Sequence, residues 1–189
     1  MPPAPPTLRA FVRRLLGATR GATALEFAMI GVPFFVLVCS TFELGMMFMT
    51  STTIEAATEA AARQIRTGQL QAGPNNSAAG FKTAVCNGMS WISTADCMAN
   101  MSIDVQTYAS FSAMSVSPPV ANGAIDSSQL TFSSGGPCSI ELVRVFYPYT
   151  LITPVLEPGL PNLGADQRLL TAAMAFRNED WQAGGAPCS

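Results

Sequence analysis

The pattern of apolar and polar positions divides the chain into one long apolar run and a mixed remainder. From Phe27 to Met49 nearly every residue is apolar or small, and Glu43 is the only charged one. Because Glu43 is near the outer end of the run, we expect its side chain to face lipid headgroups. As a helix, this run of 23 residues is roughly 34 Å long, and the hydrocarbon core of a bilayer is about 30 Å thick. The pattern therefore predicts a membrane-spanning helix, which we place at residues 21–49.

Beyond Met49 the residues become more polar, but the helical period continues. Charged side chains fall on one side of the predicted helix, and apolar ones recur on the other at the i, i+3, i+4 spacing. The apolar positions are Ile54, Ala57, Ala61 and Ile65. Gly68 is a natural helix stop. We expect one helix over about 23–67, in which residues 50–68 are an amphipathic continuation that packs on a folded domain.

The rest of the chain, residues 69–189, mixes short helical and strand patterns. Short helices are predicted from Ser77 to about Asn87 and over 94–99, and strands over 101–108 and 140–152, with a short strand suggested at 129–132. In the strand over 140–152, Pro148 indicates an edge or a bulge. Residues 168–176 fit a strand or a helix; as a strand antiparallel to 140–152 they would complete a sheet. The predicted fold class is α+β: a long N-terminal helix, its first half transmembrane, packed on a small antiparallel sheet domain.

Charge is distributed unevenly around the apolar run. Residues 1–20 contain four arginines and no acid, which predicts a basic cytoplasmic leader and an exported remainder. Residues 50–189 carry six basic and ten acidic side chains, so nucleic acid is not expected as a partner. Only 12% of all residues are charged. A surface of neutral polar groups suits a protein that packs against neighbours.

Four of the five cysteines lie beyond the apolar run, in a compartment that permits disulfides. They are Cys86, Cys97, Cys138 and Cys188. Three pairings are open to four cysteines. We favour Cys86–Cys97, which closes a short loop, and Cys138–Cys188, which ties the last segment to the start of a strand. With no histidine and no C-x-x-C spacing, a metal site is not expected, and no cofactor is predicted.

The sequence offers little for catalysis. Without histidine, Ser/His/Asp and Cys/His arrangements are excluded, and no G-x-S-x-G occurs. Asp104, Asp126 and Asp166 are far apart in the sequence and form no recognisable pattern. We therefore expect a protein that is not an enzyme.

Glu26 allows two interpretations. It can lie at the level of the lipid headgroups, where water satisfies it. Alternatively, a peptidase cuts after Gly21, so that Ala22 becomes the first residue and Glu26 the fifth. The ammonium of a neighbouring subunit could then neutralise the carboxylate in a low-dielectric setting. An ordinary secretory signal peptide is a competing explanation, but this apolar run is longer than the usual 7–15 residues.

Two parts of the chain resemble a known family. The basic cluster followed by RGATALEFAMIGVPFFVLVCSTFELGMMF and an amphipathic helix is similar to TadE-like pilus assembly proteins. These are minor pilin-like subunits of the tight-adherence (Tad/Flp) branch of type IV pili. The far end also resembles the family in Val145–Tyr149, Thr153-Pro154 and Ala175–Glu179. The resemblance covers about Arg20–Thr67 and Leu142–Asp180.

The resemblance implies a pilin-like fold and a non-enzymatic role in building a Tad/Flp-type pilus that supports adhesion. Processing is expected between Gly21 and Ala22, with Glu26 and the adjacent Phe27 as assembly residues. The expected partners are a prepilin peptidase, other minor pilins, the major Flp pilin, the pilus platform proteins and the membrane. The expected location is the inner membrane, with residues 1–20 cytoplasmic and 69–189 periplasmic, in or at the tip of a pilus. The alternative is a static single-pass anchor whose periplasmic domain binds a ligand or an envelope component.

Overall fold

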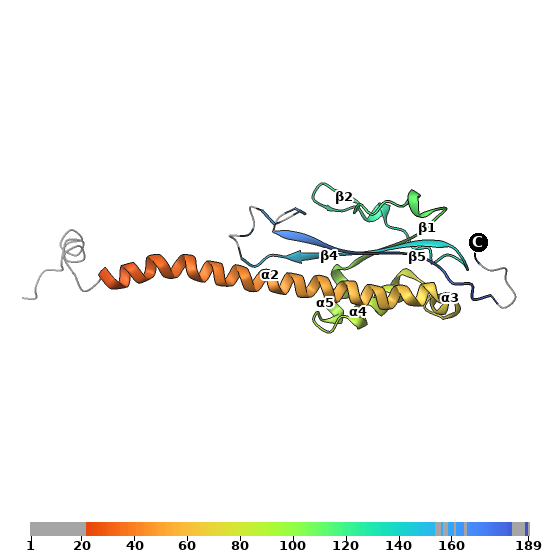
Figure 1. Cartoon of the computed structure of the whole chain (residues 1–189), viewed down its shortest axis with the longest axis horizontal. Coiled ribbons are helices and arrows are strands. Elements are labelled where there is room, and N and C mark those ends of the chain that lie inside the picture. The colour runs from red at the N-terminus through yellow and green to blue at the C-terminus, as the bar shows by residue number, and fades with distance from the viewer. Residues whose placement is uncertain are drawn as a thin grey trace, which may run out of the picture. The chain divides into compact units, whose positions relative to one another are not determined.

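The structure is a computed structural model that describes residues 22–153, 156, 159–160, 162–164, 166–182 and 188. The chain divides into two compact units, Met1–Phe42 and Glu43–Ser189. The predicted leader and Gly21 lie outside the described residues. Element labels follow Figure 1.

A single helix, α2 (Ala22–Arg66), matches the one helix predicted over about 23–67 to within one residue at each end. The part up to Phe42 belongs to the first unit, and its side chains are mostly exposed. The helix contains a window with a mean hydropathy of 2.0 in which no side chain is buried. By length and composition it is long and apolar enough to cross a membrane.

The later part of α2 belongs to the second unit and packs as predicted. The expected apolar face is buried, from Ile54 at 1% exposure to Ile65 at 0%. The helix ends just before Gly68, whose φ of +75° is the left-handed conformation that glycine adopts freely. A Cβ atom at Gly68 would also lie 2.5 Å from the ring of Trp181. Turn geometry and ring packing therefore both require glycine at this stop.

Three short helices follow: α3 (Gln69–Ala72), α4 (Ala78–Gly88) and α5 (Thr94–Asn100). The Ser77 hydroxyl caps α4 by accepting a hydrogen bond from the Gly80 N–H at 3.1 Å. Ser93 caps α5 in the same way. Helices α4 and α5 confirm the two short helices predicted from the sequence. A disulfide between Cys86 and Cys97 links α4 to α5.

The main sheet has three antiparallel strands in the order β1-β4-β5: β1 (Ser102–Tyr108), β4 (Ile140–Thr150) and β5 (Gln167–Arg177). Residues 168–176, whose pattern fits either a strand or a helix, thus belong to a strand, β5. The later part of α2, with α4 and α5, covers one face of the sheet, and the segment containing β2 (Val120–Ala121) lies over the other (Figure 1). β2 pairs with β3 (Ala124–Ile125), and short 3₁₀ turns occur at Phe111–Ala113 and Ser127–Gln129. The observed fold is α+β, as predicted.

Two details of the strand predictions need correction. No named strand forms at 129–132; Ser127–Gln129 is a 3₁₀ turn, and Phe132 makes only an isolated parallel bridge to Val105. β4 is the central strand of the sheet, although Pro148 was taken to indicate an edge or a bulge. However, β1 pairs with β4 only as far as Phe146, so at Pro148 the strand has β5 alone as a neighbour. The proline thus lies where β4 has one open side.

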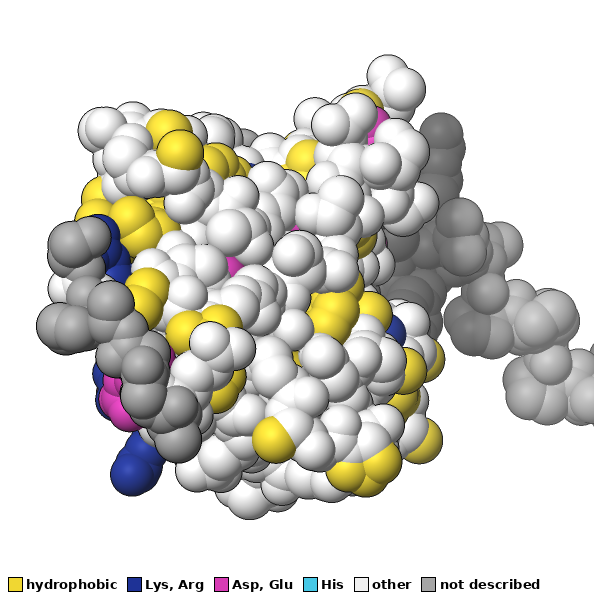
Figure 2. Space-filling model, turned by 90° about the vertical axis from the view of Figure 1, so that its right-hand side faces the viewer, with side chains coloured by type: hydrophobic (Ala, Val, Ile, Leu, Met, Phe, Trp, Pro, Cys, Tyr) yellow, Lys and Arg dark blue, Asp and Glu magenta, His cyan; other side chains and the backbone are white. Residues whose placement is uncertain are grey.

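The second unit has its main core between the sheet and the helices, and a smaller cluster on the opposite face around Phe146, Leu163 and Leu169. A second disulfide joins Cys138, just before β4, to Cys188. Both disulfides are the pairs favoured from the sequence. Seen from the end in Figure 2, most of the visible surface is neutral, with few charged side chains. This matches the low charge content of the sequence.

Candidate functional site

The predicted processing and assembly residues lie at the start of α2. Ala22 is the first residue of the helix, and Gly21 lies outside the described residues. Glu26 follows about one turn later and is exposed. Within the described part of the chain it has no hydrogen-bond or ion-pair partner. Phe27 is 72% exposed. Both side chains are thus free to contact the surroundings of the protein.

The helix continues from these residues with an apolar surface. Large apolar side chains on this stretch are between 58% and 72% exposed: Leu25, Phe27, Met29, Ile30, Val32, Phe34, Phe35, Leu37 and Phe42. Removing one such side chain from water is worth about 1.5–3 kcal/mol. A helix that is apolar all round requires lipid or protein around it. This surface is therefore a binding surface.

Glu43, the first residue of the second unit, does not lie where it was predicted. The sequence suggested that it faces lipid headgroups, but it is only 5% exposed. Its carboxylate accepts hydrogen bonds from the backbone N–H groups of Ile152 and Thr153, the latter at 2.7 Å. These residues follow the end of β4, so the carboxylate satisfies two donors that have left the sheet.

A sequence signal for this contact was present. Glu43 precedes Ile54 by eleven residues, and eleven residues make about three helical turns. Glu43 therefore lies on the same face as the buried residues of α2. The half-buried Tyr149 lies nearby: its pKa is raised by burial and, to a smaller extent, by the Glu43 charge.

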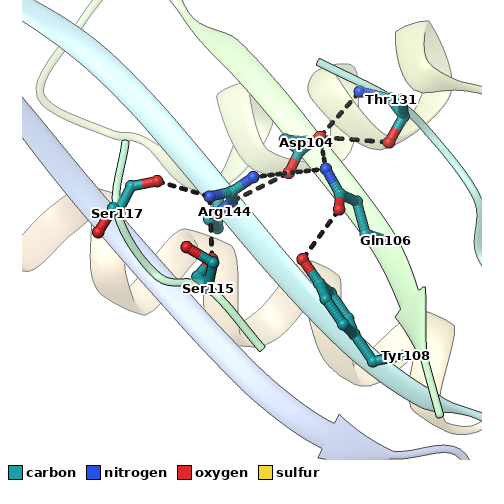
Figure 3. A network of polar contacts seen from close by, with 7 residues as sticks. All are labelled: Asp104, Gln106, Tyr108, Ser115, Ser117, Thr131 and Arg144. Atoms are coloured by element: carbon teal, nitrogen blue, oxygen red, sulfur yellow. Dashed lines mark hydrogen bonds and ion pairs between the residues drawn. The ribbon is translucent and has the colours of Figure 1, made fainter. Parts of the chain in front are cut away.

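A buried ion pair joins two strands on the other face of the sheet (Figure 3). Asp104 on β1 and Arg144 on β4 are directly opposite in the register, and both are almost fully buried. Two guanidinium N–H groups donate to the same carboxylate oxygen at 2.7 and 2.9 Å. A third donates to the backbone carbonyls of Ser115 and Ser117. The pair thus fastens the segment over this face to the sheet.

Further hydrogen bonds to the Asp104 carboxylate surround this pair. The other carboxylate oxygen of Asp104 accepts from the Thr131 N–H at 2.8 Å, and the Gln106 amide donates to both oxygens. Removing one partner of such a pair costs about 3–5 kcal/mol. Because Asp104 alternates with the apolar Ile103 and Val105, the strand pattern places its side chain on the opposite face of the strand from theirs. Only the strand register, which the sequence does not give, reveals its partner.

Two further buried polar side chains stabilise the sheet. Glu141 has no exposed surface, and its carboxylate accepts hydrogen bonds from the hydroxyls of Thr107 and Ser139. Burial raises the pKa of Glu141 in spite of these bonds. Asn178, within the predicted family-like ending, is 1% exposed, and its amide donates to the Gly136 carbonyl at 3.0 Å. That ending therefore anchors the segment after β5.

An open groove of about 440 Å³ lies between the exposed side of α2 and β5. Alanines and apolar side chains line much of it, with three charged residues of α2 beside them: Glu59, Arg63 and Arg66. Arg66 forms an exposed ion pair with Glu179 at 3.4 Å. Among the described residues no group of three or more histidine, cysteine or acidic side chains could hold a metal ion.

A comparison with protein families gives a match on α2. Residues 21–63 match the family model described as TadE-like protein. Over this segment the chain is similar to TadE-like proteins. The match confirms the first part of the resemblance inferred from the sequence, about Arg20–Thr67, and does not extend to the second part, Leu142–Asp180. It begins at the predicted processing position and ends within the packed part of α2. No curated protein and no solved structure matches the chain.

Proposed function

We propose that this chain is a non-enzymatic, minor pilin-like subunit that helps to assemble a Tad/Flp-type IV pilus and so supports adhesion. The observation that carries the proposal is the start of α2. There the TadE-like segment presents an exposed carboxylate, Glu26, followed by a helix surface that is apolar all round.

In this proposal α2 holds the subunit in the inner membrane before assembly. The arginines of residues 1–20 keep the leader in the cytoplasm, and the unit that begins at Glu43 lies in the periplasm. A prepilin peptidase cuts between Gly21 and Ala22. The new ammonium group at Ala22 pairs with Glu26 of a neighbouring subunit, and the apolar helices pack together. The neighbours are other minor pilins and the major Flp pilin, assembled by the platform proteins.

The first experiment determines the N-terminus of the protein from native membranes by intact-mass measurement. Processing predicts a chain that starts at Ala22, whereas an uncut chain starts at Met1 or Pro2. Uncut protein in cells with an active prepilin peptidase contradicts the proposal and favours the static anchor.

The second experiment replaces Glu26 by alanine and counts pili. We expect piliation to be lost while the amount of membrane-bound protein stays the same. The matched control is Glu55→Ala, since Glu55 is an exposed acid in the part of α2 that packs on the domain. Unchanged piliation in the Glu26→Ala strain removes the proposed role of this carboxylate.

The static single-pass anchor remains the second candidate because of the groove between α2 and β5. In that case the periplasmic unit binds a ligand or an envelope component, and the protein is neither cut nor built into a filament. Substitutions Ala60→Trp and Ala175→Trp, which fill the groove, would then abolish function, whereas Glu26→Ala would not.

A further inference from the structure

We propose that the end of the second unit around Glu43 lies in the membrane interface, with the Ile152 side chain inserted among lipid acyl chains. The inference rests on the membrane-spanning role of α2 in the proposed function. It adds a second contact between the protein and the lipid, made by the connection that follows β4. The residues whose contacts carry it, Glu43, Ile152 and Thr153, belong to the second unit.

The first step concerns the depth of Glu43. The 20 helical residues from Thr23 to Phe42 are about 30 Å long, which matches the thickness of a hydrocarbon core. Counted from Thr23, Glu43 therefore lies where a hydrocarbon core of this thickness ends, near the outer end of the span predicted over 21–49. The apolar surface of α2 continues past it: Phe48 is 67% and Met49 51% exposed. Glu43 thus lies at the boundary of the lipid rather than far outside it.

The second step concerns the level of Ile152. Because the Ile152 and Thr153 N–H groups donate to the Glu43 carboxylate, this part of the chain lies at the same depth as Glu43. Ile152 is 76% exposed, the highest value among the large apolar side chains that are described. An exposed isoleucine at the boundary of a bilayer gains free energy by entering the acyl chains.

The third step concerns the polar groups nearby, which must be satisfied within the protein if this end contacts lipid. The Glu43 carboxylate is 5% exposed and binds two backbone donors. The flanking stretches, 44–54 on α2 and 145–153 at the end of β4, contain no charged residue. Tyr149, next to this end, is of the type enriched at membrane interfaces.

The occupant we infer is lipid rather than a second protein because the covalent chain itself brings this surface to the bilayer. The covalent chain does not bring the exposed apolar residues elsewhere on the second unit to the bilayer in this way. Phe111 is 52% exposed, but it lies in the segment over the opposite face of the sheet, among serines. It supplies the matched control.

The test uses the full chain in phosphatidylcholine vesicles, with and without bromine-labelled acyl chains, which quench nearby tryptophan fluorescence. Trp91 and Trp181 are first replaced by phenylalanine. Tryptophan is then introduced by Ile152→Trp or, as the control, Phe111→Trp; both positions are exposed, so the fold tolerates them. We expect tryptophan at position 152 to emit at shorter wavelength and to be quenched several-fold more by brominated lipid than tryptophan at position 111.

Equal emission and equal quenching at the two positions, in vesicles that carry the protein on flotation, overturn the inference and leave the spanning helix intact. A blue-shifted emission at position 152 that brominated lipid does not quench also overturns it, since protein then covers the site. If the protein does not float with the vesicles, the inference and the membrane-spanning role of α2 fail together.

Discussion

The two parts of α2 differ in environment although they form one continuous helix. Before Glu43 the side chains are apolar in every direction and mostly exposed. After it one face is buried in the core and the opposite face carries charges. A helix gains little stability alone, so each part depends on what surrounds it. The earlier part requires lipid or neighbouring helices, and the later part is satisfied within its own unit.

The two carboxylates of α2 in or next to the apolar run follow the same division. Glu26 has no partner in the described part of the chain, whereas Glu43 binds two backbone N–H groups. A charge on an apolar helix costs little only when it is paired. Glu43 is paired within the fold, and Glu26 is left for another molecule. This difference suggests why the acid at the start of the helix is the one suited to assembly.

The largest expected effect comes from placing charge in the earlier part of the helix. The double substitution Phe35→Arg/Leu37→Arg should release the protein from membranes, because each arginine near the centre of the span costs about 2.5–3.5 kcal/mol. Flotation of cell membranes measures the bound fraction. The matched pair Ala56→Arg/Ala60→Arg, exposed on the later part, should leave it bound. Equal membrane binding of both variants would contradict the difference in environment between the parts of α2 before and after Glu43.

The next effect concerns packing. Ile65→Ala should lower the free energy of unfolding of the second unit by about 2–5 kcal/mol, because Ile65 is fully buried and leaves a cavity. Ile30→Ala, at a position 72% exposed, removes the same atoms and should leave the unfolding midpoint unchanged. Thermal unfolding in detergent measures both. A matching loss in Ile30→Ala would mean that the earlier part also belongs to the folded core.

A smaller effect distinguishes the two carboxylates. Glu43→Ala leaves the Ile152 and Thr153 N–H groups without their acceptor, which should cost about 1–3 kcal/mol. Hydrogen exchange should speed up at these two amides. Glu26→Ala should leave both amides unchanged, so protection that survives in Glu43→Ala would show that the contact does not hold this connection.

The smallest effect is a pH dependence confined to the second unit. Burial raises the pKa of Glu141 above its usual value of 4.5, so the folded state disfavours the ionised form. The contribution of Glu141 to the stability of the unit should therefore be greatest below about pH 4.5 and should fall as pH rises through the raised pKa. Glu141→Gln should remove this part of the decline in unfolding experiments across pH. Membrane binding through α2 should show no such dependence, and identical profiles for Glu141→Gln and the wild type would exclude Glu141 as the cause.

Periodic features were predictable from the sequence, and contacts between distant segments were not. The apolar run, the buried face around Ile54 and the glycine stop at Gly68 depend on neighbouring residues, so α2 was placed within a residue or two. The short helices α4 and α5 were also predicted to within a residue or two. Alternation puts Asp104 on the other face of its strand from Ile103 and Val105, but it cannot show that Arg144 lies opposite it. Glu43 was misplaced because its acceptor role depends on backbone donors more than 100 residues away.

The order of elements along the chain has a consequence for biogenesis. The buried face of α2 comes early in the sequence, but the strand that completes the sheet, β5, begins only at Gln167. The apolar face of α2 is therefore synthesised well before the strand that completes the sheet against which it packs. A nascent chain that stops before β5 has an exposed apolar face on α2 and an incomplete core. Such a chain exposes apolar residues of the kind that chaperones and proteases recognise.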